Sequence, residues 1–217
     1  MNGGVTMSPK KQSYENLAET LIKKLNMRGM EGFYCSTKEE VMPMINRLLT
    51  PGASIAWGGS ESLKEVGFFD ELEGSDYVVL DRNLVKTPEE EREFAGKVAT
   101  CDYFFMSSNA ITLDGELVNI DGRGNRVAYL IYGPQNVIVV AGMNKIVPDV
   151  EAGIKRTQNV AAPPNGVRLN TETPCATLGR CGNCLQEKCM CCEIVITRKS
   201  RIPNRIKVIL VGEELGF

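Results

Sequence analysis

The chain has 217 residues, a net charge of −2 and eight cysteines, but no histidine. The missing imidazole excludes Ser-His-Asp and Cys-His catalysis, and it excludes metal sites that need histidine ligands. Any metal must therefore be held by sulfur or oxygen. With 43% hydrophobic and 24% charged residues, the composition is that of an ordinary globular protein, and the charge gives no reason to expect binding to nucleic acid.

No apolar stretch approaches the ~20 residues of a membrane-spanning helix, and the first residues lack the apolar segment of a signal peptide. We therefore expect a cytoplasmic protein without membrane contact, in which cysteines serve as thiols or metal ligands before they form disulfides. Residues 1–12 are polar and are expected to be a flexible end. A single domain is expected over residues 13–217.

The first predicted elements are a helix, a strand and a second helix. Leucines at every fourth position predict a helix that begins after Ser13 and ends at Gly29. A short strand follows at 32–35. A helix is then expected over 37–49, before the helix-stopping pair of proline and glycine.

From residue 54 onward, apolar strands alternate with helices. The predicted strands are 54–57, 77–80, 103–106, 137–141 and 206–211. The predicted helices between them are 60–66, 88–98 and 148–157. This alternation is typical of an α/β fold with a mainly parallel, open sheet covered by helices on both faces. A hairpin with an Asp114-Gly115 turn is expected after the strand at 103–106.

Six cysteines lie in one short segment near the C-terminus, with the spacing Cys175-x5-Cys181-x2-Cys184-x4-Cys189-x-Cys191-Cys192. The segment belongs to an insertion, 165–200, that we call the cysteine module. Thiolates this close together can point several sulfurs at one metal centre. Buried or disulfide-paired cysteines are the alternative. The spacing favours an iron–sulfur cluster over zinc, with Cys191 preferred as fourth ligand and Cys189 and Cys192 as its competitors.

Polar loops follow the carboxyl ends of five predicted strands, which is where ligands bind in open parallel sheets. Taken singly, each loop is more typical of a simple connection than of a binding site. Together they favour a pocket for a small anionic molecule. The candidate binding residues are Gly58, Gly59, Ser60, Ser108, Asn109, Arg123, Asn144 and Lys145. The candidate acid–base carboxylates are Glu65, Asp121 and Glu213.

In this binding set, Gly58, Gly59 and Ser60 would offer backbone N–H groups at a helix start, and Lys145 and Arg123 would supply positive charge.

The segments 57–67, 107–126 and 132–147 resemble the LUD-domain family, lactate-utilisation proteins related to the LutC/YkgG group. The likeness continues through Thr173-Pro174-Cys175 to the terminal IKVILVGEELGF, and so covers most of the chain from about residue 14.

The resemblance implies a fold like that of ribose-phosphate isomerase, glucosamine-phosphate deaminase and the CoA-transferases. It also implies an association with oxidation of lactate or related hydroxy acids by iron–sulfur proteins. Relatives with a cysteine loop resemble Cys-x5-Cys-x2-Cys-x6-Cys, which implies a [4Fe–4S] cluster on Cys175, Cys181, Cys184 and Cys191. The additional Cys189 departs from that pattern and leaves the fourth ligand open.

The leading hypothesis is a redox-associated metabolic protein whose cluster lies near a pocket for a carboxylate- or phosphate-bearing metabolite. The second is a non-catalytic subunit with structural zinc that docks onto a hydroxy-acid dehydrogenase or another iron–sulfur partner. The third is a metal-independent enzyme resembling isomerases or CoA-transferases, with a loop carboxylate as base or nucleophile. Pairing with a second copy of the chain stays open.

Overall fold

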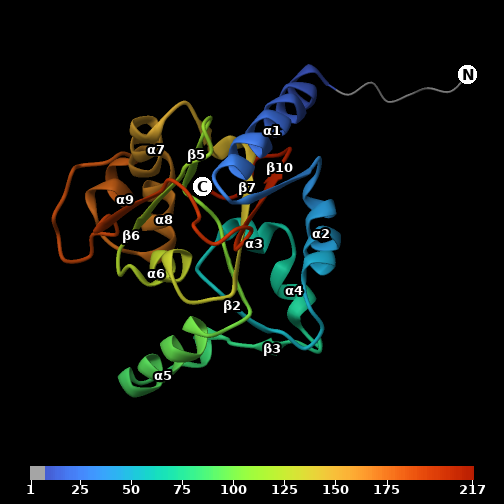
Figure 1. Ribbon diagram of the computed structural model, residues 1–217. Coiled ribbons are helices and arrows are strands. Elements are labelled where there is room, and N and C mark those ends of the chain that lie inside the picture. The colour runs from blue at the N-terminus through green and yellow to red at the C-terminus, as the bar shows by residue number, and fades with distance from the viewer. Residues whose placement is uncertain (1–7) are drawn as a thin grey trace, which may run out of the picture.

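The computed structural model describes residues 8–217 and builds them around two sheets (Figure 1). The larger sheet has six parallel strands in the order β1-β10-β7-β4-β2-β3, so the predicted α/β class is confirmed. Its strands are β1 (Glu31–Cys35), β2 (Ser54–Trp57), β3 (Val78–Val79), β4 (Tyr103–Met106), β7 (Asn136–Gly142) and β10 (Ile206–Val211). Residues 1–7 of the expected flexible end lie outside the described residues.

Helices alternate with these strands along the chain. They are α1 (Pro9–Met27), α2 (Val41–Leu48), α3 (Glu61–Glu65), α4 (Phe68–Leu72), α5 (Pro88–Ala99), α6 (Asn125–Ile131), α7 (Val150–Arg156), α8 (Ala162–Leu169) and α9 (Pro174–Leu178). Short turns of 3₁₀ helix are η1 (Lys38–Glu40), η2 (Arg82–Leu84) and η3 (Met143–Lys145), and η4 (Thr157–Ala161) is a π-helical turn. No helix in the described part of the chain is long and apolar enough to cross a membrane.

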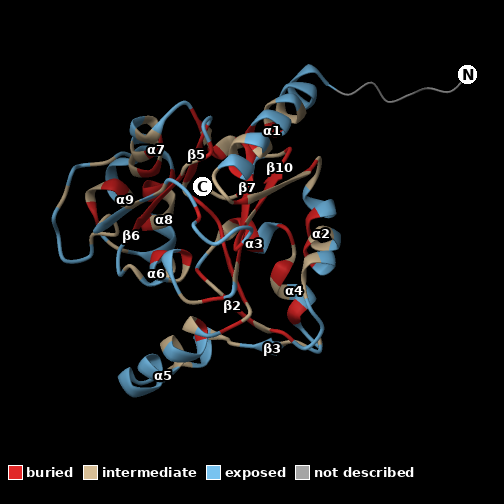
Figure 2. Ribbon diagram, viewed as in Figure 1, coloured by how far each residue is buried: buried red, intermediate tan, exposed pale blue. Residues whose placement is uncertain are grey.

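Buried residues are concentrated on the central strands (Figure 2). Alternating side chains of these strands form two separate cores, one on each face of the large sheet. In β4, Phe104 and Met106 face the core covered by α1 and α6, whereas Tyr103 and Phe105 face the core covered by α2, α3 and α4. All four residues of this strand are buried. Burial on both faces explains why the central strands are continuous apolar runs in the sequence.

A second, four-stranded sheet has the order β8-β5-β6-β9. Its strands are β5 (Ala110–Thr112), β6 (Leu117–Asp121), β8 (Ile146–Val147) and β9 (Glu193–Thr197). The antiparallel β5–β6 pair confirms the expected hairpin, and Gly115 takes the left-handed conformation in its turn. Because β9 comes from the cysteine module and pairs with β6, the module is joined to the body of the protein through this sheet.

The start of α1 differs from the expected one. The helix begins at Pro9, and the hydroxyl of Ser8 accepts a hydrogen bond from the amide of Lys11 at 3.3 Å. The expected cap at Ser13 is wrong, because a serine followed directly by proline is the stronger start signal.

Candidate functional site

The carboxyl ends of β2, β4, β6 and β7 open into one cavity of about 760 Å³. One wall comes from the loops that follow these strands. The opposite wall comes from η4, α8 and the cysteine module. Residues of the module that line it are Cys189, Met190, Cys191 and Cys192. The cavity therefore joins the strand-end loops to the cysteines.

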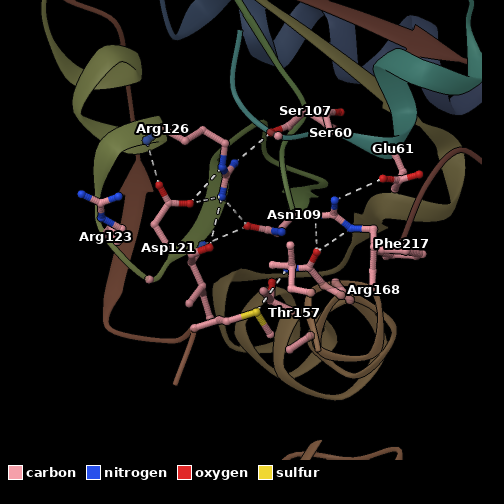
Figure 3. A pocket seen from close by; sticks show the side chains of 18 of the residues that line it. Ser60, Glu61, Ser107, Asn109, Asp121, Arg123, Arg126, Thr157, Arg168 and Phe217 are labelled. Atoms are coloured by element: carbon pink, nitrogen blue, oxygen red, sulfur yellow. Dashed lines mark hydrogen bonds and ion pairs between the residues drawn. The ribbon is translucent and has the colours of Figure 1, made fainter. Parts of the chain in front are cut away.

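Positive charge predominates on the cavity wall. Its basic residues are Lys64, Arg82, Arg123, Arg126, Lys145, Arg168 and Lys188. Its acidic residues are Glu61, Asp121 and Glu187. In Figure 3 the Arg168 guanidinium points to Glu61 across the cavity, and the two groups are 3.5 Å apart. An excess of basic side chains in a concave, partly shielded site favours an anionic ligand.

Arg126 and Asp121 form a buried ion pair at one side of the cavity (Figure 3). The side chains are 11% and 9% exposed, and Nη2 lies 2.6 Å from Oδ1. The other carboxylate oxygen accepts the backbone N–H groups of Arg126 and Val127 at the start of α6, at 3.0 and 3.1 Å. Arg126 also donates to the side-chain oxygens of Asn119 and Asn109. The pair thus fixes the end of β6 to α6 and leaves Asp121 with both oxygens occupied.

The loop after β2 makes room for this arginine. A Cβ on Gly58 would lie 2.9 Å from Cγ of Arg126, so only glycine permits the close approach. Ser60 caps α3, since its hydroxyl accepts the amide of Leu63 at 3.2 Å. Gly59 and Ser60 line the cavity, whereas Gly58 lies buried behind it.

Lys145 is the most deeply buried amine of the site. The residue is 4% exposed, and its Nζ donates to the hydroxyls of Ser62 and Ser107, each at 3.0 Å. Burial, followed by the nearby Arg156 and Arg126, lowers the pKa of Lys145 from 10.5 to about 7.

The end of the chain folds over this lysine. The Asn144 side chain accepts the amide of Leu215 at 3.1 Å and donates to its carbonyl at 3.4 Å. The Glu65 carboxylate accepts the amide of Gly216 at 2.9 Å. A Cβ on Gly216 would lie 2.7 Å from Oγ of Ser62, so the backbone passes directly over that hydroxyl. Asn144 and Glu65 therefore hold the terminal segment in place.

The structure brings together part of the predicted set. The residues that line the cavity are Gly59, Ser60, Ser108, Asn109, Asp121, Arg123 and Lys145. Those that lie outside its wall are Gly58, Glu65, Asn144 and Glu213. Arg123 is mostly exposed and pairs with Glu91 of α5 at 2.8 Å. The catalytic roles given to Glu65, Asp121 and Glu213 stay predictions.

Sequence reasoning missed several wall residues, of which Ser62, Arg126 and Arg168 are the most important. Ser62 lies inside α3, two positions after the predicted binding loop Gly58–Ser60. Arg168 comes from α8 in the cysteine module. The positive charge of Arg126 is visible in the sequence, but its pairing with Asp121 depends on the fold.

Four other cysteines of the module lie around Cys191. Burial, followed by the thiols of Cys189, Cys181, Cys175 and Cys184, raises the pKa of Cys191 to about 12. Backbone amides point at two of the sulfurs: the N–H of Asn183 donates to Cys181 at 3.3 Å, and that of Cys191 donates to Cys189 at 3.4 Å.

The donor chemistry of this module fits a thiolate-bound metal, because several cysteines and two N–H···S contacts lie together. The arrangement of the sulfurs does not yet form a ligand set. Within residues 8–217, no group of three or more cysteine and carboxylate side chains is placed so that it could hold a metal ion. A metal would therefore require the cysteines to move closer together.

Comparisons with known proteins agree with this architecture. A solved structure of a DUF162 family protein from Deinococcus radiodurans superimposes with a TM-score of 0.52. The alignment covers 91% of this chain and 98% of that one, at 14% sequence identity, which shows a shared fold. Among curated proteins, no sequence matches. The family model of the LUD domain matches residues 18–211, and the chain therefore belongs to the LUD-domain family.

Proposed function

We propose that the protein is a redox-associated metabolic protein of the lactate-utilisation type, which binds a small carboxylate-bearing metabolite beside a cysteine-bound [4Fe–4S] cluster. The metabolite is a hydroxy acid or the corresponding oxo acid, and it occupies the cavity at the carboxyl ends of the strands. Membership of the LUD-domain family supports the general assignment. One observation carries the proposal: the same cavity has basic residues on one wall and Cys189–Cys192 on another.

The excess of basic over acidic residues supports the anionic part of this proposal. Arg82 of η2 and Arg168 of α8 are exposed and line the cavity. The Arg168 guanidinium contacts Glu61 and Asn165, and a carboxylate ligand would replace these contacts. Arginine pairs with a carboxylate through two parallel hydrogen bonds, so it also orients the ligand. Arg126 is less suited to this task, because Asp121 and two asparagines already occupy its N–H groups.

The grouping of thiols around Cys191 supports the metal part. We assign Cys175, Cys181, Cys184 and Cys191 as the ligands, with Cys189 as the competing fourth ligand. Cys175 is buried at the start of α9 and hydrogen-bonded to Thr173 at 3.2 Å, so it would be the fixed member of the set. When bound, a cluster would supply one-electron redox chemistry next to the cavity.

The metal is tested by purifying the full chain without oxygen and measuring iron, sulfide, zinc and visible absorption. We expect iron and sulfide at about four of each per chain, with broad absorption near ~400 nm from thiolate-to-iron charge transfer. The variant Cys184→Ser is expected to lose most of the iron. Cys35→Ser is the matched control, because Cys35 is buried in the core away from the module. Wild-type protein without iron would refute the cluster.

Ligand binding is tested by calorimetry with L-lactate and with oxamate, an inert analogue of a 2-oxo acid. We expect binding that weakens at least tenfold in the variant Arg168→Gln, which removes the charge while keeping a polar side chain. Lys155→Gln is the matched control, since Lys155 is exposed on α7 and pairs with Glu151. Failure of both compounds to bind would refute the carboxylate site.

A structural zinc site in a docking subunit is the second candidate. The observation that favours it is apolar exposure on the cysteine module, where Leu178 is 61% and Leu185 is 100% exposed. Exposed leucines beside a metal loop fit a surface that a partner protein covers. Zinc at about one equivalent, with four thiolate ligands and no iron, would favour this candidate over the cluster.

A further inference from the structure

Lys145 lacks the partner that a buried lysine usually has. Its residue is 4% exposed, and both of its hydrogen bonds go to neutral hydroxyls, those of Ser62 and Ser107. Within residues 8–217, it forms no ion pair with a carboxylate. A buried ammonium without a counter-ion is strongly disfavoured, so this environment favours the neutral amine.

The charged groups around Lys145 act in the same direction. Arg156 and Arg126 are the neighbouring cations that disfavour a further positive charge, and Glu65 is the carboxylate that opposes them. The Glu65 carboxylate, however, is engaged by the amide of Gly216. Desolvation together with adjacent cations is the arrangement that makes a lysine nucleophilic at neutral pH.

The amine also lies at the wall of the cavity. Lys145, Ser62 and Ser107 all line the cavity, so a ligand there can approach Nζ. The two hydroxyls lie on either side at hydrogen-bond distance, where they can pass a proton between the nitrogen and an oxygen bound to the same carbon. Basic residues elsewhere on the wall favour a carboxylate on the same ligand. A ligand with a carbonyl group next to a carboxylate fits both the Lys145 amine and the basic residues of the cavity wall.

We propose that Lys145 forms an imine with the carbonyl carbon of a 2-oxo acid bound in the cavity. The nitrogen lone pair attacks that carbon, and a proton moves from nitrogen to the carbonyl oxygen through Ser62 or Ser107. The second proton of the nitrogen then reaches the resulting hydroxyl by the same route, and the hydroxyl leaves as water while the C=N bond forms. Amine and oxo acid therefore give imine and water with no oxidant or reductant. This inference rests on the proposed carboxylate site and names its substrate class.

The test is reductive trapping on the full chain. The protein is incubated with pyruvate, the simplest 2-oxo methyl ketone, and sodium cyanoborohydride, followed by intact mass measurement and peptide mapping. We expect one carboxyethyl group per chain, located on Lys145. L-Lactate under the same conditions should leave the mass unchanged, because it has no carbonyl group to attack.

Three variants sharpen the result. Lys145→Arg should lose the label, and Lys155→Arg, an exposed lysine, should keep it. Ser62→Ala retains the amine and should slow trapping by about tenfold, in line with the loss of a proton relay. The trapping rate of Ser62→Ala also tests the proposal if the variant Lys145→Arg folds poorly. Labelling spread over exposed lysines with Lys145 unmodified would overturn the proposal.

Oxamate separates this inference from the function on which it rests. Its carbonyl is an amide, which an amine does not attack under these conditions, so it reports only on the carboxylate site. Oxamate binding without a pyruvate adduct would refute the imine and leave the proposed function standing. Absence of both oxamate binding and adduct would refute the carboxylate site itself.

Discussion

The buried pair of Asp121 and Arg126 allows a quantitative prediction for the variant Asp121→Ala. This substitution removes the carboxylate from a side chain that is 9% exposed and leaves the guanidinium of Arg126, 11% exposed, without its counter-ion. It also removes the acceptor of two backbone N–H groups at the start of α6. The variant therefore combines an unpaired buried charge with a lost helix cap.

Breaking a buried ion pair by removing one partner costs roughly 3–5 kcal/mol in free energy of unfolding. Each lost backbone hydrogen bond contributes about 1 kcal/mol within that range. For a chain of 217 residues this corresponds to a decrease in Tm of roughly 6–20 °C. Replacing both residues, as in Asp121→Leu with Arg126→Met, should recover at least ~1 kcal/mol, because no buried charge then remains unpaired.

The assay is urea unfolding followed by circular dichroism under reducing conditions, with thermal melting as the second measurement. Asp114→Ala is the matched control, since Asp114 pairs with Lys24 at an exposed site and its loss should leave the midpoint near that of wild type. A decrease in the free energy of unfolding below ~1 kcal/mol for Asp121→Ala would refute the assignment of this pair as a support of the cavity wall. A double variant destabilised by more than the summed destabilisations of its two single variants would refute it as well.

Further expectations concern the lysine, the cores and the terminal segment. Because burial lowers the pKa of Lys145 to about 7 in the folded chain, the unfolded chain binds the extra proton between about pH 7 and 10.5. The stability of wild type relative to Lys145→Met should therefore rise from pH 7 to pH 10 in urea titrations, and a flat difference would contradict the burial. Phe105→Ala, at a fully buried side chain, should cost roughly 3–5 kcal/mol by the same assay. Gly96→Ala, inside α5 with open space around it, should instead stabilise the protein by roughly 0.5–1 kcal/mol. Glu65→Ala should accelerate hydrogen exchange at the amide of Gly216, and unchanged exchange would argue against that contact.

The central strands of the large sheet could be predicted because they are buried on both faces. The run Tyr103–Met106 is apolar throughout, and all of it is buried in the fold. The second sheet was harder to foresee. Its strand β8 has two residues, and β9 has a largely exposed face within the cysteine module, so neither gives a buried apolar run. Their pairing depends on contacts between distant segments, which local patterns do not specify.

The candidate site could likewise be predicted only in part. Strand ends pointed to Ser108, Asn109 and Lys145, since topology alone brings such loops to one edge of a sheet. Which groups pair there depends on side-chain contacts. Glu65 was expected beside a ligand, but it holds the amide of Gly216. The hydroxyls that accept hydrogen bonds from Lys145 belong to Ser62 in α3 and to Ser107 after β4, and the sequence does not show that these distant residues meet.

The anchoring of the cysteine module limits how it can rearrange. At one end, Cys175 lies buried in α9; at the other, the amide of Cys192 donates to the carbonyl of Asp121 at 2.9 Å, where β9 begins to pair with β6. Because the loop is anchored at both ends in the folded chain, most of the conformational entropy of closing it is already lost on folding. Between these two anchored residues lie Cys181, Cys184 and Cys189. If the loop contracts around a metal, the movement is transmitted through Cys192 to the wall of the cavity.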